Sequence, residues 1–494
     1  MADRPDILFL FSDQHARRVA GAYGDPLGAT PNLDALAARG VTFDNAYCPS
    51  PICTPSRMSL LTGRWPHEQS CWTLDDMLAS DLPTYAHALG AAGYRTISVG
   101  RMHSVGPDQH HGFAERLIGD CAPNWMGVAR QRLGPLVGAQ GPSGPGPDGL
   151  ARSLALSGRG QSGYEVVDDA TTVTACDRLA DLGRSRRGGD PTPFGMVVGF
   201  ILPHCPFVAR GAEYDRFEGR VPAPSLPVPG SEPAWLRQWR AEACSEGASE
   251  DVIARARTAY WGLVHALDAK IGRIMDALRV AGLNENTLVI YASDHGEHAG
   301  ERGLWWKNTM YEESAGVPLI LSWPGRLPQG TRSGRICNLV DLGATMIAAA
   351  GAPPLPRSRG RDLVPFAGDA AAKGETFVEY VTDLSSPWTG TTAQCIRMVR
   401  SGRWKYVHAE GDRPMLFDLE TDPDETCDLW NSPDHAKLRA DLKTQVLAGW
   451  DPAAIRAEVD ARCAEKAVLK EWGRQTQPES TAQFMIEDSD NWLE

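Results

Sequence analysis

The sequence lacks any apolar stretch long enough to cross a membrane, and its first apolar run, residues 7–11, is too short for the core of a secretion signal. It has few cysteines, 11 among 494 residues, and their odd number and irregular spacing argue against a disulfide framework and fit a reducing compartment. Positive charge is not in excess, because 49 lysines and arginines face 62 acidic residues for a formal charge of −13. We therefore expect a cytoplasmic protein that binds neither nucleic acid nor membranes.

Short apolar runs alternate with helical patterns through most of the chain. The run 6–11 is apolar without alternation, as in a strand buried on both faces, and further strands are expected at 94–99, 194–202 and 287–292. The apolar spacing between them predicts helices at 31–39, 84–92, 168–182 and 254–281. This alternation predicts an α/β fold with a large, mostly parallel sheet sandwiched by helices.

The C-terminal part has a different pattern. Strand-like segments at 375–380, 395–399, 404–407 and 416–418 predict a smaller antiparallel sheet. We therefore divide the chain into an α/β catalytic domain (1–370), a small α+β subdomain (371–445) and a helical or extended tail (446–494). The tail is polar except for a few apolar residues near its end, which is typical of a segment that docks, and one interpretation is a contact within a homo-oligomer.

Cys53 begins the segment CTPSR, which continues as MSLLTGR. Pro55 suits the first turn of a helix, so Cys53 is expected where backbone N–H groups and the helix dipole favour an anion. Arg57 follows about one turn later, where it can steady both a nucleophile and an anionic substrate. An isolated cysteine at such a place is usually structural, but the longer pattern through Gly63 and Arg64 favours a nucleophile.

Two acidic motifs follow predicted strands. Asp13 and Gln14 come after the strand 6–11, and Asp294 and His295 come after the strand 287–292. Ligands gather at the carboxyl ends of strands in open α/β sheets. Carboxylates from two strands, with an amide and an imidazole beside them, suit a hard divalent cation. Asp13 alone would be interpreted as a turn residue, but together with the Cys53 motif the pattern predicts a metal site.

Basic residues also follow the predicted strands. Arg101 and His103 come after 94–99, His204 comes after 194–202, and Lys307 follows the segment GLWW. Single histidines and lysines at loop ends are common, but these would share one edge of the sheet. Arginine binds an oxyanion through a planar fork and does not easily give up a proton, so we expect Arg101 to bind substrate and the others to transfer protons.

The segment CTPSRMSLLTGR resembles the signature of the formylglycine-dependent sulfatase family, within the alkaline-phosphatase-like superfamily. Residues 100–115 and 293–307 look like its choline-sulfatase and phosphonate monoester hydrolase branch. The resemblance implies that a formylglycine-generating enzyme oxidises Cys53, the modified residue, and that the hydrated aldehyde is the nucleophile. It assigns Asp13, Gln14, Asp294 and His295 to one divalent cation, with calcium preferred over manganese or magnesium.

The resemblance also implies a mechanism and a substrate class. His204 or Lys307 would protonate the leaving oxygen, and His103 would take a proton from the hydrated aldehyde. The expected substrate is a small alkyl or aryl sulfate ester, and choline sulfate is one candidate. Choline would need an aromatic or acidic cage, although tryptophans more often pack in a core; the tryptophans available are Trp72, Trp125, Trp305, Trp306 and Trp388.

The segment 121–163 resembles that branch least, and we expect it to set substrate choice. Its Gly-, Pro- and Ser-rich part, 134–163, is either a flexible loop or a lid. One alternative function is a phosphonate monoester or phosphodiester hydrolase that uses the same site. Another is a degenerate member that only binds a ligand, but such a protein would lack the nucleophile or a metal carboxylate, and Cys53, Asp13 and Asp294 are all present.

Overall fold

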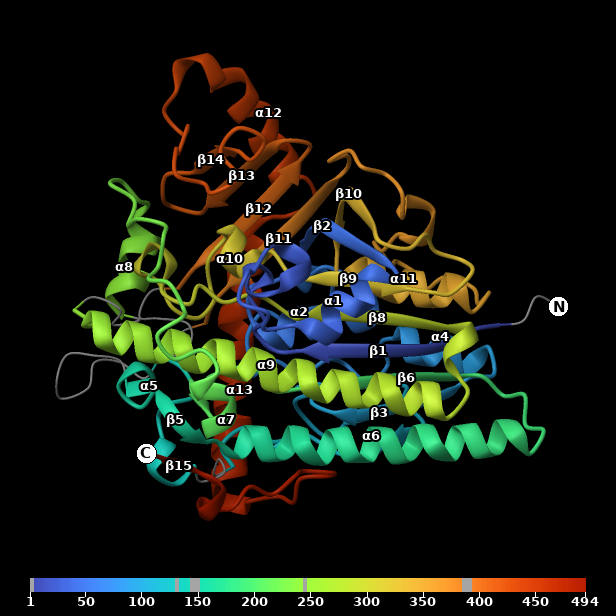
Figure 1. Cartoon of the computed structure of the whole chain (residues 1–494). Coiled ribbons are helices and arrows are strands. Elements are labelled where there is room, and N and C mark those ends of the chain that lie inside the picture. Colours follow the sequence, from blue (N-terminus) through green and yellow to red (C-terminus); the bar gives the residue numbers. More distant parts are fainter. Residues whose placement is uncertain (1–3, 129–132, 143–151, 243–246, 384–392) are drawn as a thin grey trace.

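The chain is built around an eight-stranded sheet with the order β10-β2-β9-β8-β1-β6-β3-β4 (Figure 1). The computed structural model describes residues 4–128, 133–142, 152–242, 247–383 and 393–494. The strands of this sheet are β1 (Asp6–Ser12), β2 (Val41–Tyr47), β3 (Arg95–Gly100), β4 (Glu115–Arg116), β6 (Phe194–Gly199), β8 (Thr287–Ser293), β9 (Leu319–Ser322) and β10 (Thr331–Asn338). Strands β8, β1, β6 and β3 are adjacent and parallel, whereas β9 is antiparallel to both of its neighbours. The predicted, mostly parallel sheet is confirmed.

Strand β1 lies inside the sheet because its sequence is apolar on both faces, and all of its residues are buried. Helices α1 (Pro31–Ala38), α6 (Gly163–Arg187) and α9 (Glu250–Val280) pack together on one side, and Figure 1 shows α6 and α9 crossing the near face. Helices α2 (Cys53–Thr62), α4 (Tyr85–Ala91) and α11 (Val340–Ala349) pack together on the other side. Helix α9 begins earlier than predicted, because the Ser249 hydroxyl accepts a hydrogen bond from the Val252 N–H and caps it.

The predicted strand 194–202 is shorter in the structure. Strand β6 ends at Gly199, and the N–H groups of Ile201 and Leu202 donate instead to the buried carboxylate of Asp168, at 2.9 and 2.8 Å. Backbone N–H groups in a protein interior must find acceptors, so a side chain that supplies one can end a strand. Asp168 lies on α6, and this helix therefore fixes where the chain leaves the sheet and turns toward His204.

The C-terminal part forms a separate antiparallel sheet, as predicted, with the order β11-β12-β13-β14. Its strands are β11 (Glu375–Val381), β12 (Cys395–Ser401), β13 (Trp404–Ala409) and β14 (Met415–Asp418), and α12 (Ala436–Leu447) packs on it. The remaining helices are α3 (Pro66–Gln69), α5 (Arg152–Ala155), α7 (Gly211–Asp215), α8 (Ala234–Glu242), α10 (Glu312–Ala315) and α13 (Pro452–Thr476), with short 3-10 turns between elements.

The C-terminal tail docks on its own chain. After α13, strand β15 (Trp492–Leu493) pairs with β5 (Gly158–Gln161), which also pairs with β7 (Val208–Ala209). The Ser480 hydroxyl accepts from the Asn124 N–H at 3.0 Å, and the Gln483 amide donates to the Cys121 carbonyl at 3.0 Å. The tail therefore covers the described part of the segment expected to set substrate choice. An oligomer contact and the division of the chain into three parts stay predictions.

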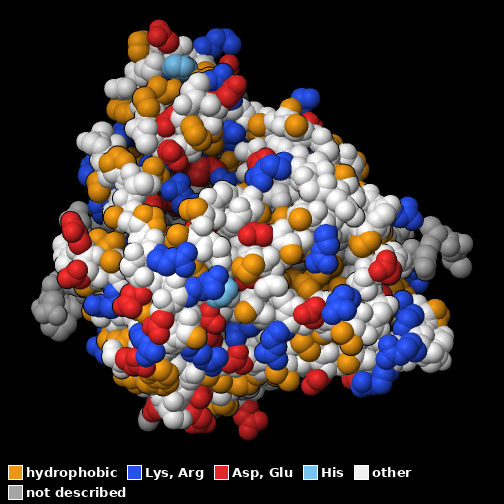
Figure 2. Space-filling view, in the orientation of Figure 1, with side chains coloured by type: hydrophobic (Ala, Val, Ile, Leu, Met, Phe, Trp, Pro, Cys, Tyr) orange, Lys and Arg blue, Asp and Glu red, His pale blue; other side chains and the backbone are white. Residues whose placement is uncertain are grey.

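The surface carries charges of both signs. Figure 2 shows acidic and basic side chains interspersed across the visible face. Every helix within the described ranges is too short or too polar to cross a lipid bilayer.

Candidate active site

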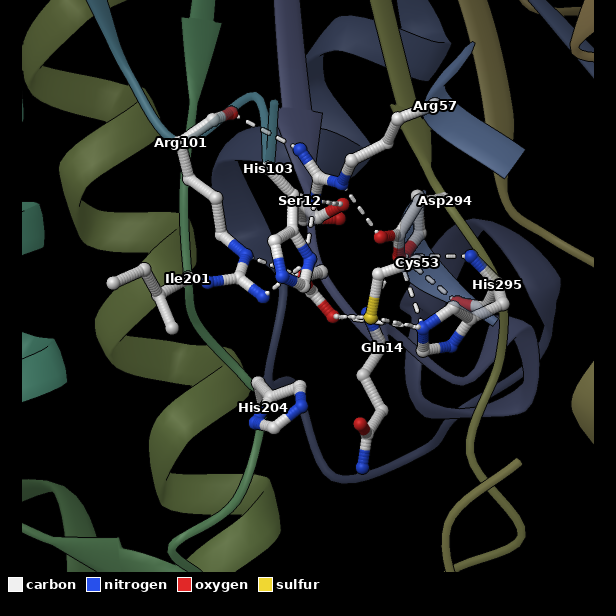
Figure 3. A network of polar contacts seen from close by, with 12 residues as sticks. Ser12, Gln14, Cys53, Arg57, Arg101, His103, Ile201, His204, Asp294 and His295 are labelled. Carbon is white, nitrogen blue, oxygen red and sulfur yellow. Dashed lines mark hydrogen bonds and ion pairs between the residues drawn. The ribbon is translucent and has the colours of Figure 1, made fainter. Parts of the chain in front are cut away.

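Several chain segments meet at the carboxyl edge of the main sheet and bring the predicted residues together (Figure 3). The edge is shared because β8, β1, β6 and β3 are parallel neighbours. Asp13 and Gln14 follow β1, Arg101 and His103 follow β3, His204 lies beyond β6, Asp294 and His295 follow β8, and Cys53 and Arg57 lie on α2. Lys307 does not follow a strand directly; it comes from the loop after the short turn at Glu301–Gly303.

Cys53 is the first residue of α2, as predicted, and its side chain is buried. The helix ends at Gly63, whose φ of 69° lies in the left-handed region that glycine adopts most easily. Burial, together with the Asp13 carboxylate, raises the pKa of the Cys53 thiol to about 12. A thiol with this pKa is protonated at neutral pH and is a poor nucleophile.

Three buried side chains converge around Cys53. The ligand-type atoms of Asp13, Cys53, Asp294 and His295 all lie within 4.8 Å of one another. His295 Nε2 is 3.1 Å from the Cys53 sulfur and 3.6 Å from one carboxylate oxygen of each aspartate. Its Nδ1 donates to the Gly296 carbonyl at 3.0 Å, which leaves the Nε2 lone pair facing the cluster. Two carboxylate oxygens and an imidazole lone pair that face one point fit a divalent cation.

Two arginines hold the outer oxygens of these carboxylates. Arg57 donates to Asp294 Oδ2 at 2.8 Å and to Asp13 Oδ2 at 3.2 Å, and Arg101 donates to Asp13 Oδ2 at 2.7 Å. Burial alone would raise the pKa of Asp13, but the guanidinium groups of Arg101 and Arg57 hold it well below its ordinary value. The Asp13 carboxylate is therefore charged, and the Oδ1 atoms of both aspartates remain turned toward His295.

Gln14 lies beside this cluster, but its side-chain amide has other partners. The amide oxygen accepts from the Lys307 ammonium at 2.5 Å, and the amide nitrogen donates to Glu297. Glu297 is fully buried and also accepts from the N–H groups of Ala299 and Trp306, both at 2.7 Å. Sequence reasoning missed this glutamate, although it lies inside the motif at 293–307. It ties the Asp294 loop to the backbone beside Lys307.

Lys307 and His204 form a second pair. The Lys307 ammonium donates to His204 Nε2 at 3.1 Å, and His204 Nδ1 donates to the Cys205 carbonyl at 2.6 Å. Burial and the neighbouring lysine lower the pKa of His204 well below its ordinary value, so the ring is neutral. The pair therefore offers one proton donor and one neutral acceptor close to Cys53.

Arg101 and His103 form a third pair at the site. Arg101 Nη2 lies 3.0 Å from His103 Nδ1, and burial together with Arg101 lowers the pKa of His103 to about 3. His103 has a φ of 55° and Gln14 a φ of 68°, both in the left-handed region. Non-glycine residues rarely hold this conformation, and where they do it often serves a functional site.

A cavity of about 260 Å³ opens onto Cys53, Arg101, His103, His204 and Lys307. Its outer wall includes apolar and aromatic side chains from the segment after β4, from α6 and from the tail: Trp125, Met126, Leu133, Tyr164 and Ile486. Of the tryptophans available for a choline cage, Trp125 lines this cavity. Trp72, Trp305 and Trp306 are buried in the core and do not line it, and Trp388 lies outside the described residues.

Comparison with known proteins agrees with this geometry. A family model described as Sulfatase matches residues 5–352, and one described as N-sulphoglucosamine sulphohydrolase, C-terminal, matches residues 300–449. The choline-sulfatase of Rhizobium meliloti is 33% identical over 486 residues, which cover 95% of this chain and 91% of that protein. The arylsulfatase K of Homo sapiens is 27% identical over 450 residues, which cover 86% of this chain and 78% of that protein.

Solved structures share the fold. A phosphonate monoester hydrolase of Agrobacterium radiobacter is similar with a TM-score of 0.69 and 21% identity, over 92% of this chain and 96% of the other. A protein solved in complex with its substrate D-glucosamine-2-N,6-O-disulfate is similar with a TM-score of 0.70 and 20% identity, over 91% of this chain and 99% of the other.

Proposed function

This chain belongs to the sulfatase family, and from that premise we propose that it hydrolyses a small alkyl or aryl sulfate ester with residue 53 as the nucleophile. That it is a sulfuric ester hydrolase follows from the family and from its named relatives. The observation that carries the finer proposal is the convergence of Cys53 with Asp13, Asp294 and His295 at the end of one cavity.

The size and lining of the cavity favour a small substrate. Ligand pockets for drug-sized molecules measure about 300–1,000 Å³, and about 260 Å³ lies below that range. Trp125, Met126 and Tyr164 offer apolar contact to an alkyl or aryl group, beside polar lining residues such as Ser104 and Gln140. An alkyl or aryl group fits such a wall, and a quaternary ammonium such as choline would also interact favourably with the faces of Trp125 and Tyr164.

The residues present fit one divalent cation and a formylglycine at 53. Asp13, Asp294 and His295 would hold the cation, with Gln14 as the fourth proposed ligand, and calcium is proposed first because most of the donors are oxygens. When bound, the cation would polarise the sulfate and activate the hydrated aldehyde made from Cys53 by a maturation enzyme.

The surrounding side chains divide the remaining work. Arg57 holds the two carboxylates in place, and Arg101 presents a guanidinium N–H to the sulfate oxygens. Lys307 is the proton donor to the leaving oxygen, because its ammonium already donates to His204, whose neutral ring keeps it in place. The role of His103 is taken up in the next subsection.

The alternative reaction, on a phosphonate monoester or phosphodiester, would use the same residues. The imidazole of His295 in the cluster supports this alternative reaction. A histidine at this position is a feature of the phosphonate hydrolase branch that the sequence resembles. Sulfate and phosphonate are both tetrahedral oxyanions, so rates on matched substrates must separate them.

The first experiment is mass spectrometry of the peptide that contains residue 53, from active purified protein. We expect the cysteine to be replaced by formylglycine, which lowers the peptide mass by a defined amount. Sulfate release from an aryl sulfate is then compared with phosphonate release from the matched aryl phosphonate. The control variant Cys48→Ser changes another buried cysteine, whose thiol lies 4.0 Å from the Ser314 carbonyl, and should keep its activity. Unmodified cysteine in fully active protein would contradict the proposal.

Location and assembly complete the proposal. We propose a cytoplasmic protein because ten cysteines within the described ranges are free thiols. We also propose a homo-oligomer, because α13 and the tail expose large apolar side chains, among them Val468 and Met485, which are 70% and 62% exposed. Size-exclusion chromatography with light scattering tests the second statement.

A further inference from the structure

Asp120 is a buried carboxylate beside the active site that no sequence motif included. It is 4% exposed, and its two oxygens lie 3.1 and 3.4 Å from Arg101 Nη1, which donates to them. The Ala122 N–H donates to the same carboxylate at 3.2 Å. The tail holds the backbone here, because the Phe484 N–H donates to the Asp120 carbonyl at 3.0 Å. Asp120 therefore has a fixed place from which it holds one end of Arg101.

Arg101 is held at a second point by Asp13, which accepts from Nε at 2.7 Å. Carboxylates on Nε and Nη1 fix the plane of the guanidinium, because both bonds lie in that plane. The remaining nitrogen, Nη2, lies 3.0 Å from His103 Nδ1. A guanidinium can only donate, so His103 Nδ1 is the acceptor, and a neutral imidazole that accepts at Nδ1 carries its proton on Nε2.

We propose that Asp120 is a positioning residue that acts through Arg101 to keep the proton of His103 on Nε2, so that this histidine donates a hydrogen bond to the charged oxygens of the substrate. This role differs from the one that the family resemblance implies. A ring with an occupied Nδ1 lone pair and a protonated Nε2 has no nitrogen left to take a proton.

The other two histidines of the site show the contrast. His204 and His295 both donate from Nδ1 to a backbone carbonyl, at 2.6 and 3.0 Å, so their lone pairs lie on Nε2. His103 alone among these three has a cation against Nδ1. Burial and the neighbouring Arg101 keep the His103 ring neutral, and with a φ of 55° its backbone turns the ring toward Arg101.

Nitrogen-15 NMR of the histidine-labelled enzyme, loaded with calcium, reads the tautomer directly. The two nitrogens of a neutral imidazole have different chemical shifts, and the protonated one is identified by its couplings to the ring protons. His103 is assigned by the signals lost in His103→Gln. We expect the His103 proton on Nε2, and the opposite tautomer for His204. A proton on His103 Nδ1 in the unaltered enzyme would overturn the proposal without any variant having to fold.

A double-mutant cycle tests whether Asp120 acts through Arg101. Asp120→Asn should lower kcat about 10- to 100-fold, as expected for the loss of a charge-assisted hydrogen bond that orients a reacting group. In the Arg101→Lys background Asp120→Asn should lower kcat about twofold or less, because the guanidinium that Asp120 holds is already absent. Equal losses in both backgrounds would show that Asp120 acts independently of Arg101 and would overturn the proposal.

The matched control is Glu115→Gln, which removes a carboxylate in the same stretch that pairs with Arg178 at 2.6 Å, away from the site. It should leave kcat and the His103 tautomer unchanged. The proposed role of Asp120 in catalysis rests on the proposed function, but the experiments distinguish a failure of one from a failure of the other. An enzyme without sulfatase activity contradicts the proposed function, whereas an active enzyme with His103 protonated on Nδ1 contradicts only the role of Asp120.

Discussion

Arg57 gives the most direct test of how the two carboxylates proposed to bind the cation are held in place. Its guanidinium is fully buried and joins the strand ends of β1 and β8 by donating to Asp13 at 3.2 Å and to Asp294 at 2.8 Å. Its other donors reach the carbonyls of Arg101 and Ser12, at 3.0 and 3.3 Å, and its plane stacks over Phe11 at 4.6 Å. Arg57→Ala would leave two buried carboxylates short of a counter-charge.

The expected loss can be worked out from these contacts. A hydrogen bond to a charged group contributes about 1.5–3 kcal/mol, and removing one partner of a buried ion pair costs about 3–5 kcal/mol. Asp13 keeps its bond from Arg101, and Asp294 keeps bonds from two backbone N–H groups, those of Gln14 and His295. We therefore expect a loss near the lower end, about 3 kcal/mol of unfolding free energy in the absence of calcium.

Urea unfolding at neutral pH measures this loss, with EDTA in one series and excess calcium in the other. Calcium should restore part of the stability of Arg57→Ala, because the cation then balances the same carboxylates. The matched control is Arg302→Ala. Arg302 is also buried, donates to Glu313 at 3.1 Å and stacks over Tyr311 at 4.2 Å, so its loss should not respond to calcium. A loss below about 1 kcal/mol for Arg57→Ala in EDTA would refute the reasoning.

Three further outcomes are expected. Lys307→Ala should slow alkyl sulfates by about 10²–10⁴-fold but activated aryl sulfates much less, because a good leaving group needs no proton; kcat across a series of phenol sulfates measures this. Burial lowers the pKa of His298 to about 3, from its ordinary value of 6.5. The unfolded chain therefore protonates His298 at a higher pH than the folded protein does. The free energy of unfolding should fall as the pH drops below 6.5, by about 2 kcal/mol at pH 5. Urea titrations of His298→Asn should show a correspondingly weaker pH dependence. Gly63→Ala should destabilise more than Gly93→Ala in the same assay, by about 1 kcal/mol or more. Both glycines have positive φ, but a side chain at Gly63 would meet the Ser358 hydroxyl at 2.3 Å, whereas Gly93 is open. Equal losses for the two glycine variants would show that Ser358 moves away at no cost.

The backbone placement of the site could be predicted from the sequence because it follows from strand order. Once Asp6–Ser12 and Thr287–Ser293 are parallel neighbours, Asp13 and Asp294 must lie side by side. Cys53 could be placed by Pro55 and the helical spacing that follows. No feature of the sequence could show that Gln14 would turn its amide to Lys307 and Glu297, because side-chain partners depend on which loops meet.

The residues that sequence reasoning missed share one property. Glu297 and Asp120 act on other side chains rather than on a ligand, and an acidic residue in a loop has many alternative explanations. The predicted end of the strand at 194–202 was wrong for a related reason. The apolar run continues past Gly199, but the N–H groups of Ile201 and Leu202 donate to Asp168 on a helix distant in the sequence. Tertiary partners of this kind leave no local pattern.

The charges of the site explain how an acidic chain can attract an anionic ester. The chain as a whole carries a formal charge of −13. Around residue 53, the cationic side chains Arg57, Arg101 and Lys307 are matched by the carboxylates Asp13, Asp120 and Asp294. These six charges cancel, so the protein alone has little net attraction for sulfate at this point. A divalent cation held by Asp13, Asp294 and His295 would make the site positive by two charges in a buried place, where charge interactions are strong. Binding of the anionic group should therefore depend on the cation before any bond is broken, and Arg57 serves mainly to keep the carboxylates in position.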